Sequence, residues 1–125
     1  MTSDVLAELM ELLIGFKSKG NIEAVVVASR SGVNLASSVP LNTNADTLAA
    51  MSSALKNAAD IMIGQGKNDL AQRVVIECER SKLIIVGAGK KALIVVLAGE
   101  NSSLGRLFVE IDHITYQITE MLDSC

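Results

Sequence analysis

The sequence contains few of the residues that build metal-binding, base-stacking or catalytic sites. It has one histidine, two cysteines, two phenylalanines, one tyrosine and no tryptophan. A structural zinc site takes four ligands, mostly Cys and His, so this chain is too poor in both to form one. The few aromatic rings cannot form a platform on which successive nucleic-acid bases stack. The composition therefore argues against a zinc protein and against a single-strand nucleic-acid binder.

The charge and the apolar runs exclude two further classes of partner. The formal net charge is −3 and the pI is near 5.1, so the chain lacks the basic field that attracts phosphate backbones. No apolar run reaches the roughly 18 residues that a membrane span requires, and the N-terminus has no basic stretch before an apolar segment. We expect a cytoplasmic protein with no nucleic-acid partner and no direct membrane insertion.

The two cysteines do not suggest a disulfide or a redox site. Cys78 falls within a strand pattern, Cys125 is the last residue, and no Cys-x-x-Cys motif occurs. Thiols in a cytosolic chain are usually reduced, and a strand cysteine among apolar neighbours is usually buried and inert. We expect this for Cys78.

At 125 residues, with 50% hydrophobic residues, the chain is long enough for one core and too short for two. We therefore expect a single domain, 1–125. An apolar fraction this high also suggests that part of the surface is covered by a partner.

Helical periodicity appears in three segments, 4–17, 45–63 and 104–122, with Ser3, Asn44 and Ser102 or Ser103 as candidate N-caps. Strand patterns appear at 22–29, 33–38, 73–79, 82–86 and 92–97, joined by short turns that favour antiparallel pairing. The order is α-β-β-α-β-β-β-α. The sequence thus predicts an α/β (α+β) fold, with a five-stranded antiparallel sheet covered by helices.

The motifs that resemble functional sites have simpler explanations. Gly87–Ala92 matches the loose pattern G-x-G-x-x-A, but a strand follows it where a dinucleotide site requires a helix, so we predict a hairpin turn. His113 lies mid-helix beside Asp112 and is expected to be solvated. Glu77 and Glu79 share one face of a strand, which is more typical of a solvated or partner-facing surface than of acid–base catalysis. No catalytic residue, cofactor or metal is predicted.

The second helix carries two distinct rows of side chains. Small residues such as Ala49, Ser52 and Ser53 form one row, where another backbone can approach closely. The other row is apolar, at steps of three and four. The pattern leaves open which row faces the sheet and which faces a partner. The apolar row consists of Leu48, Met51, Leu55, Ala58 and Met62.

The order and spacing of these segments resemble the roadblock / dynein light chain family over nearly the whole chain. Gly20–Ser37 is similar to the opening hairpin of that family, an apolar strand, a short turn with glycine, and a strand ending in Ala-Ser. Later similarities lie at Ile76-Glu77, at Gly87-Ala88-Gly89, at 93–97, and at 101–105, which leads into the last helix.

This resemblance implies a roadblock/profilin-like sheet with helices on both faces and a homodimer. Many members pair through the third strand to make one continuous sheet, with the second helices side by side. Strand 73–79 ends a meander, so it can be an edge that favours pairing. Carried over to this sequence, the dimer interface would contain Val74, Val75, Ile76, Glu77, Cys78, Leu48, Met51, Leu55 and Ala58.

The resemblance also implies a function without an active site. Prokaryotic roadblock domains often act with small Ras-like GTPases, as regulators that in some cases stimulate GTP hydrolysis, or as scaffolds. We expect such a partner to contact exposed residues of the second helix, namely Lys56, Asn57, Asp60 and Gln65. Two alternatives stay open, a purely structural subunit that pairs with another roadblock or longin-type domain, and a small-molecule sensor.

Overall fold

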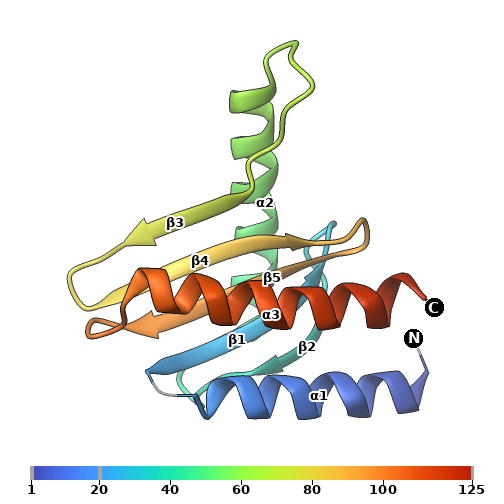
Figure 1. Ribbon diagram of the computed structural model, residues 1–125, viewed down its shortest axis with the longest axis vertical. Helices are drawn as coiled ribbons and strands as arrows, with labels where there is room; N and C mark the ends of the chain where they lie inside the picture. Colours follow the sequence, from blue (N-terminus) through green and yellow to red (C-terminus); the bar gives the residue numbers. More distant parts are fainter. Residues whose placement is uncertain (1, 20, 125) are drawn as a thin grey trace.

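In the residues that the structure describes, five strands form one sheet, and three helices cover its two faces (Figure 1). The computed structural model describes residues 2–19 and 21–124. The predicted order α-β-β-α-β-β-β-α is confirmed. The elements are α1 (Ser3–Lys17), β1 (Ile22–Ser29), β2 (Asn34–Ser38), α2 (Ala45–Gly64), β3 (Arg73–Glu77), β4 (Ser81–Ala88), β5 (Ala92–Gly99) and α3 (Leu104–Asp123).

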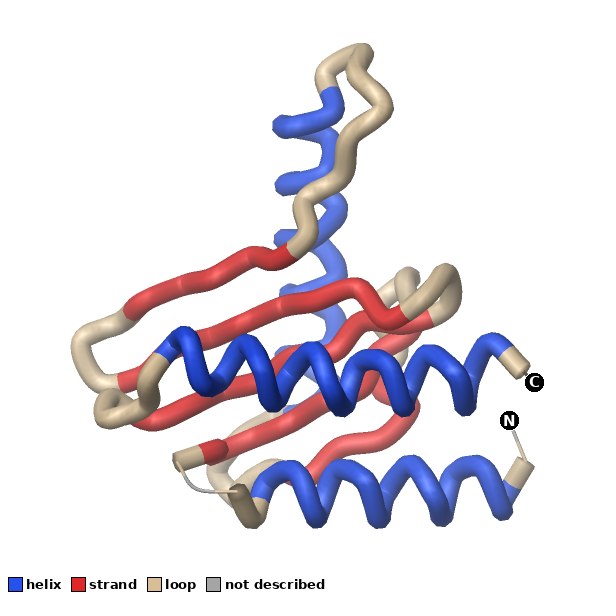
Figure 2. The backbone as a smooth tube through the Cα atoms, viewed as in Figure 1, coloured by secondary structure: helices blue, strands red, loops and turns tan. Residues whose placement is uncertain are grey.

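All neighbouring strands pair antiparallel, in the spatial order β2-β1-β5-β4-β3 (Figure 2). Short connections join β1 to β2, β3 to β4, and β4 to β5, as hairpin turns require. The first and last strands of the sheet in space are therefore β2 and β3. The prediction that the third strand forms an edge is confirmed.

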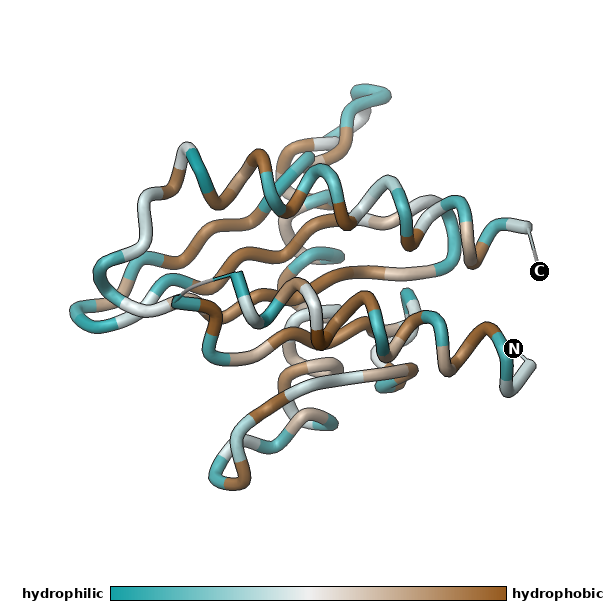
Figure 3. Tube along the Cα trace, turned by 60° about the horizontal axis from the view of Figure 1, so that its bottom comes forward, coloured by the Kyte–Doolittle hydropathy of each residue, from teal (hydrophilic) through white to brown (hydrophobic). Residues whose placement is uncertain are grey.

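The core is divided into two layers by the sheet. The larger one lies under α1 and α3 and includes Leu13, Ile111 and Ile118, all fully buried. The smaller one lies under α2 and contains Val26, Ala28, Ala49, Ile85 and Val95. Because both faces are covered, the central strands are apolar on both sides rather than alternating, and Figure 3 shows them largely in the hydrophobic colour.

Helix α2 crosses behind the strands and extends past β3, the edge of the sheet (Figure 1). Its N-terminal half lies on the sheet, where the Ser53 hydroxyl donates to the Arg30 carbonyl at 2.6 Å. Its last turns and the following loop project beyond the sheet (Figure 2). In a single chain, the projecting part of α2 therefore has no sheet beneath it.

Three sequence predictions about local structure were wrong. The N-cap of α1 is Thr2, whose side chain accepts from the Val5 amide, so the helix begins one residue earlier than expected. The third strand ends at Glu77 instead of Glu79, because the Cys78 amide turns to donate to the Ser81 carbonyl. Cys78 is consequently exposed, not buried, and Cys125 and Gly20 lie outside the described residues.

The β1–β2 turn depends on a glycine under α2. Gly32 has φ of +95°, and a Cβ there would lie 3.1 Å from the Ala50 Cα of α2. Gly66 also has positive φ, at +84°, but a Cβ there would meet nothing within 4 Å. At both positions an added side chain would strain the backbone, but only at Gly32 would its Cβ also crowd a neighbouring helix.

We expect Gly32→Ala to destabilise the protein by about 2 kcal/mol or more, since it adds a backbone clash to the unfavourable φ. Gly66→Ala, the matched control, should cost only about 1 kcal/mol. Urea denaturation of both variants measures the difference. Equal losses would show that the approach of α2 to the turn contributes nothing.

Candidate interaction surface

The outer edge of β3 is the open edge of the sheet. Within residues 2–19 and 21–124, β4 is the only strand that pairs with β3. The opposite edge differs, because β2 packs against both α1 and α2 and is followed directly by Val39 and Pro40. Proline beside an edge strand is a common way to block it, and no proline lies next to β3 in the sequence.

The two faces of β3 point toward different helices. Arg73 lies on the α3 side, where its guanidinium donates to Asp112 at 3.0 and 3.1 Å and stacks 4.5 Å from the Phe108 ring centroid. Val75 and Glu77 share that side by alternation and are exposed. Val74 faces α2 and packs against its core cluster.

Helix α2 separates its two rows of side chains between the sheet and solvent. The row of small residues, which includes Ala49, Ser52 and Ser53, is buried and packs on the sheet. Of the apolar row, Leu48 packs partly against the core, but Met51, Leu55, Ala58 and Met62 are exposed. The question that the sequence left open is thereby answered, since the small residues approach the chain's own sheet and the large apolar ones point outward.

The apolar surface also extends further than predicted. Ile61, Ile63 and Leu70 are exposed on the projecting end of α2 and the loop after it. The run Ile61-Met62-Ile63 beside Gly64 was a visible signal, because three consecutive large apolar residues cannot all face one side of a helix. With Met51 and Leu55, these side chains form an exposed apolar row along α2, and Val75 adds an exposed apolar side chain at the β3 edge, on the side of the sheet that faces α3. The apolar row of α2 and the open edge of β3 are together called here the α2–β3 surface.

One predicted contact residue is not on the surface at all. Lys56 is only 3% exposed, so the prediction that it is an exposed contact was wrong. Its ammonium group lies 2.8 and 2.9 Å from the two oxygens of Asp60, one turn later on α2. Asp60 also accepts from the Ala71 amide at 2.8 Å. Lys56 and Asp60 therefore fasten the loop before β3 to α2.

Several groups act on the carboxyl of Asp60. Burial raises its pKa, but hydrogen bonds from Lys56 and the Ala71 amide, together with the positive charges of Lys56 and Arg30, lower the pKa below its ordinary value overall. A lowered aspartate pKa means that the ionised form is stabilised by folding. The Asp60 carboxylate thus stabilises the fold by holding the loop before β3 against α2. Of the four predicted contact residues, Asn57 and Gln65 are the two that are exposed.

The residues that could carry metal or nucleotide chemistry are scattered in the part of the chain that the structure describes. None of them form a group of three or more His, Cys, Asp or Glu side chains that could hold a metal ion. His113 is exposed, as predicted. A hairpin turn joins β4 to β5, as predicted, but it spans only 89–91, because Gly87 and Ala88 still pair with β5. The Arg30 guanidinium donates to the Gly89 carbonyl in that turn. Among the described helices, none is both long and apolar enough to cross a membrane.

Solved structures with this fold include several bacterial proteins. A search of curated proteins finds no match. The gliding protein MglB of Thermus thermophilus is 19% identical, with a TM-score of 0.88 over 100% of this chain and 96% of that one. MglB of Myxococcus xanthus is 16% identical, with a TM-score of 0.90 over 99% and 94%. At these identities the likeness concerns the fold.

A third structure and a sequence profile carry the roadblock name. A Roadblock/LC7 domain from Streptomyces avermitilis is 23% identical, with a TM-score of 0.82 over 90% of this chain and 96% of that one. The sequence profile of the Roadblock/LC7 domain matches residues 8–98, from the middle of α1 to the end of β5. The chain therefore belongs to the Roadblock/LC7 domain family.

Proposed function

We propose that this chain is a non-catalytic homodimeric regulator or scaffold of a small Ras-like GTPase. The observation that carries the proposal is the α2–β3 surface. It joins an unpaired strand edge to a row of exposed apolar side chains, and Met51 is 60% exposed and Met62 is 62% exposed. Contiguous exposed apolar surface of this kind marks interaction sites in soluble proteins.

The sequence of β3 is complementary to itself when two copies run antiparallel. The strand reads Arg-Val-Val-Ile-Glu, with Val75 at its centre. A twofold axis at Val75 places Arg73 of one copy opposite Glu77 of the other, and Val74 opposite Ile76. Opposite charges in facing positions stabilise a strand pair. The Arg73 guanidinium is already held by Asp112 at 3.0 and 3.1 Å, so it is positioned at this edge before any pairing takes place.

The projecting end of α2 supports the same arrangement. Figure 1 shows that α2 projects beyond the edge of its own sheet. In the proposed dimer, the strands of the second copy would continue the sheet beneath this projecting part of α2. Each copy then covers the exposed apolar residues of the other, including Ile61 and Met62. Membership in the Roadblock/LC7 family supports pairing of this type. The two α2 helices then lie side by side as one docking surface, with Asn57 and Gln65 among the exposed polar residues.

Light scattering after size exclusion tests the dimer, and titration with nucleotide-loaded GTPases tests the partner. We expect a mass of twice 13.2 kDa. The candidates are small Ras-like GTPases encoded near the gene, loaded with GDP or with a non-hydrolysable GTP analogue. We expect one nucleotide state to bind at least about tenfold more tightly, a difference of about 1.4 kcal/mol.

The same titration separates regulation from scaffolding. Faster GTP hydrolysis in the complex would establish a regulator that acts on the GTPase reaction. Binding that is equal in both nucleotide states would leave the scaffold role alone. A monomer at tens of micromolar, or a dimer that binds no small GTPase in either state, would contradict the proposal.

A further inference from the structure

A groove runs between α1 and α3, on the face of the sheet opposite α2. The two helices lie side by side and antiparallel, with the start of α1 and the end of α3 at the same end of the molecule (Figure 1). The groove has a volume of about 850 Å³ and is open along its length. On α1, its lining residues Val5, Glu8, Leu12 and Gly15 recur every three or four positions, so it follows the helix from end to end.

The floor of this α1–α3 groove is apolar. Val5, Leu12 and Met121 are only partly buried, and they form the upper layer of the core where it meets the groove. Tyr116 lies at the margin and is exposed. The apolar floor is in contact with solvent in the single chain, and covering it would gain free energy in proportion to the apolar area removed from water.

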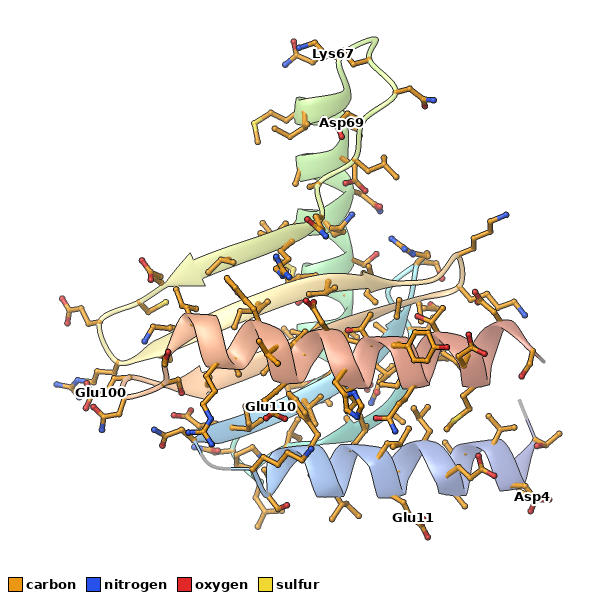
Figure 4. All side chains as sticks on the ribbon, in the orientation of Figure 1. Asp4, Glu11, Lys67, Asp69, Glu100 and Glu110 are labelled. Carbon is orange, nitrogen blue, oxygen red and sulfur yellow. The ribbon has the colours of Figure 1, made fainter. Side chains whose placement is uncertain are left out.

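The margins of the groove are acidic. Four glutamates and one lysine line it, giving a formal charge of −3, which equals the net charge of the whole chain. The positive and negative formal charges on the rest of the chain therefore cancel. Lys19 lies 3.5 Å from Glu110 at one end of the groove, and Figure 4 shows Glu110 between the two helices. Among the described residues, no ion pair involves Glu8, Glu11 or Glu120.

A glycine faces the groove from inside α1. Glycine in a helix interior costs about 1 kcal/mol relative to alanine, and Gly15 has no positive φ or internal close contact that would require it. A Cβ at Gly15 would meet nothing within 4 Å. The position therefore leaves space in the groove that the chain itself does not fill.

We propose that the α1–α3 groove binds a basic amphipathic helix of a partner protein. An apolar stripe on such a helix would cover the floor, and lysines and arginines at its flanks would meet the carboxylates at the margins. The open space at Gly15 would admit a large side chain of the bound helix. This inference does not rest on the proposed function, because the residues that line the groove include none from α2 or β3.

The charge excludes two other occupants of the groove. A second copy docked groove to groove would bring four more glutamates against the four already there, and like charges in contact are costly. A membrane surface rich in anionic lipids would be repelled for the same reason. A cationic segment is the occupant that both the floor and the margins favour.

The test uses a fluorescent model peptide of about 15 residues, matched to the length of α1. It carries leucines at i, i+3, i+4 and i+7 and lysines elsewhere, and a second peptide carries glutamates in place of the lysines. In anisotropy titrations, we expect the lysine peptide to bind at least about tenfold more tightly than the glutamate peptide, and more weakly as salt is raised. Equal binding of the two peptides, or no binding by either at about 100 µM, would overturn the proposal.

Two glycine variants show whether the groove is the site. Gly15→Leu fills the groove, and Gly105→Leu places the same side chain on α3 outside it, where a Cβ also meets nothing within 4 Å. Both should fold as the wild type, because each replaces a helical glycine by a better helix former. We expect Gly15→Leu to lower the affinity for the lysine peptide at least about tenfold, and we expect Gly105→Leu to leave that affinity unchanged.

Unchanged binding to Gly15→Leu would place the peptide elsewhere on the acidic chain and would overturn the assignment. A fall in the mass of the native assembly on Gly15→Leu, with no effect on the peptide, would instead assign the groove to a contact between copies.

Discussion

Val75→Asp is expected to convert the proposed dimer into a folded monomer of 13.2 kDa. Val75 is the central residue of β3 and is 37% exposed, so aspartate is tolerated in the isolated chain. In a twofold strand pair centred on Val75, the two aspartates would face each other, and like charges directly opposite destabilise the pairing. We expect dimerisation to weaken at least about a hundredfold, and light scattering over a concentration series measures the loss.

Ile14→Asp is the matched control. Ile14 is an exposed aliphatic residue on α1, whose described residues contact neither α2 nor β3, and its replacement should leave the dimer intact. Met51→Asp on α2 provides an independent test, since it places a charge on the α2–β3 surface without changing β3. If both Val75→Asp and Met51→Asp remain dimers, the dimer interface lies elsewhere on the molecule.

Lys56→Ala should lower the free energy of unfolding by about 3 kcal/mol. Removing one partner of a buried ion pair typically costs about 3–5 kcal/mol, because the other charge is left uncompensated. The Asp60 side chain is 17% exposed and can recover some hydration, so the lower end of that range applies. The hydrogen bond from the Ala71 amide to Asp60 is also expected to weaken, because Lys56 no longer holds the Asp60 carboxylate in place. We therefore expect faster hydrogen exchange at the Ala71 amide. Urea denaturation at a fixed protein concentration gives the loss in stability.

Two comparisons isolate the ion pair from other effects of that change. Lys67→Ala, in the exposed loop labelled in Figure 4, should be nearly neutral. The folded state lowers the pKa of Asp60, so the stability from its ionised form is present above the unfolded pKa and is lost as pH falls through the folded one. The gap between wild type and Lys56→Ala should therefore narrow below about pH 4. If the difference in the free energy of unfolding stays constant with pH, the destabilisation by Lys56→Ala comes from lost packing of the aliphatic part of the lysine side chain and not from the ion pair.

The element order could be predicted because each segment has one dominant period. The strands 22–29 and 92–97 are runs of β-branched and aliphatic residues, which suit a strand buried on both faces. The amphipathic rows in 4–17 and 104–122 match a helix with one covered side, and Asn44 caps α2 by accepting from the Thr47 amide, as predicted. These signals are local, so one sequence is sufficient to read them.

The burial of Lys56 could not be predicted from the helical periodicity, because it depends on Ala71, which lies in the loop after the helix. An i, i+4 pair of Lys56 and Asp60 is typical of an exposed helix face. Here the loop at Ala71 closes over the pair and removes it from solvent. Likewise, Cys78 was assigned to a strand by its alternation, but the turn to Ser81 ends the pairing two residues early. Both errors arise where a loop, and not a regular element, determines the burial of a side chain.

The unequal edges of the sheet determine how far an assembly can grow. Each chain offers one open edge at β3, whereas β2 lies against two helices and runs into Pro40. When two copies join through β3 about a twofold axis, both open edges are used, and the outermost strands of the joined sheet are the two blocked β2 strands. Strand addition then ends after one step. The same backbone hydrogen bonding that drives fibre formation in other sheet proteins would here give a particle of fixed size.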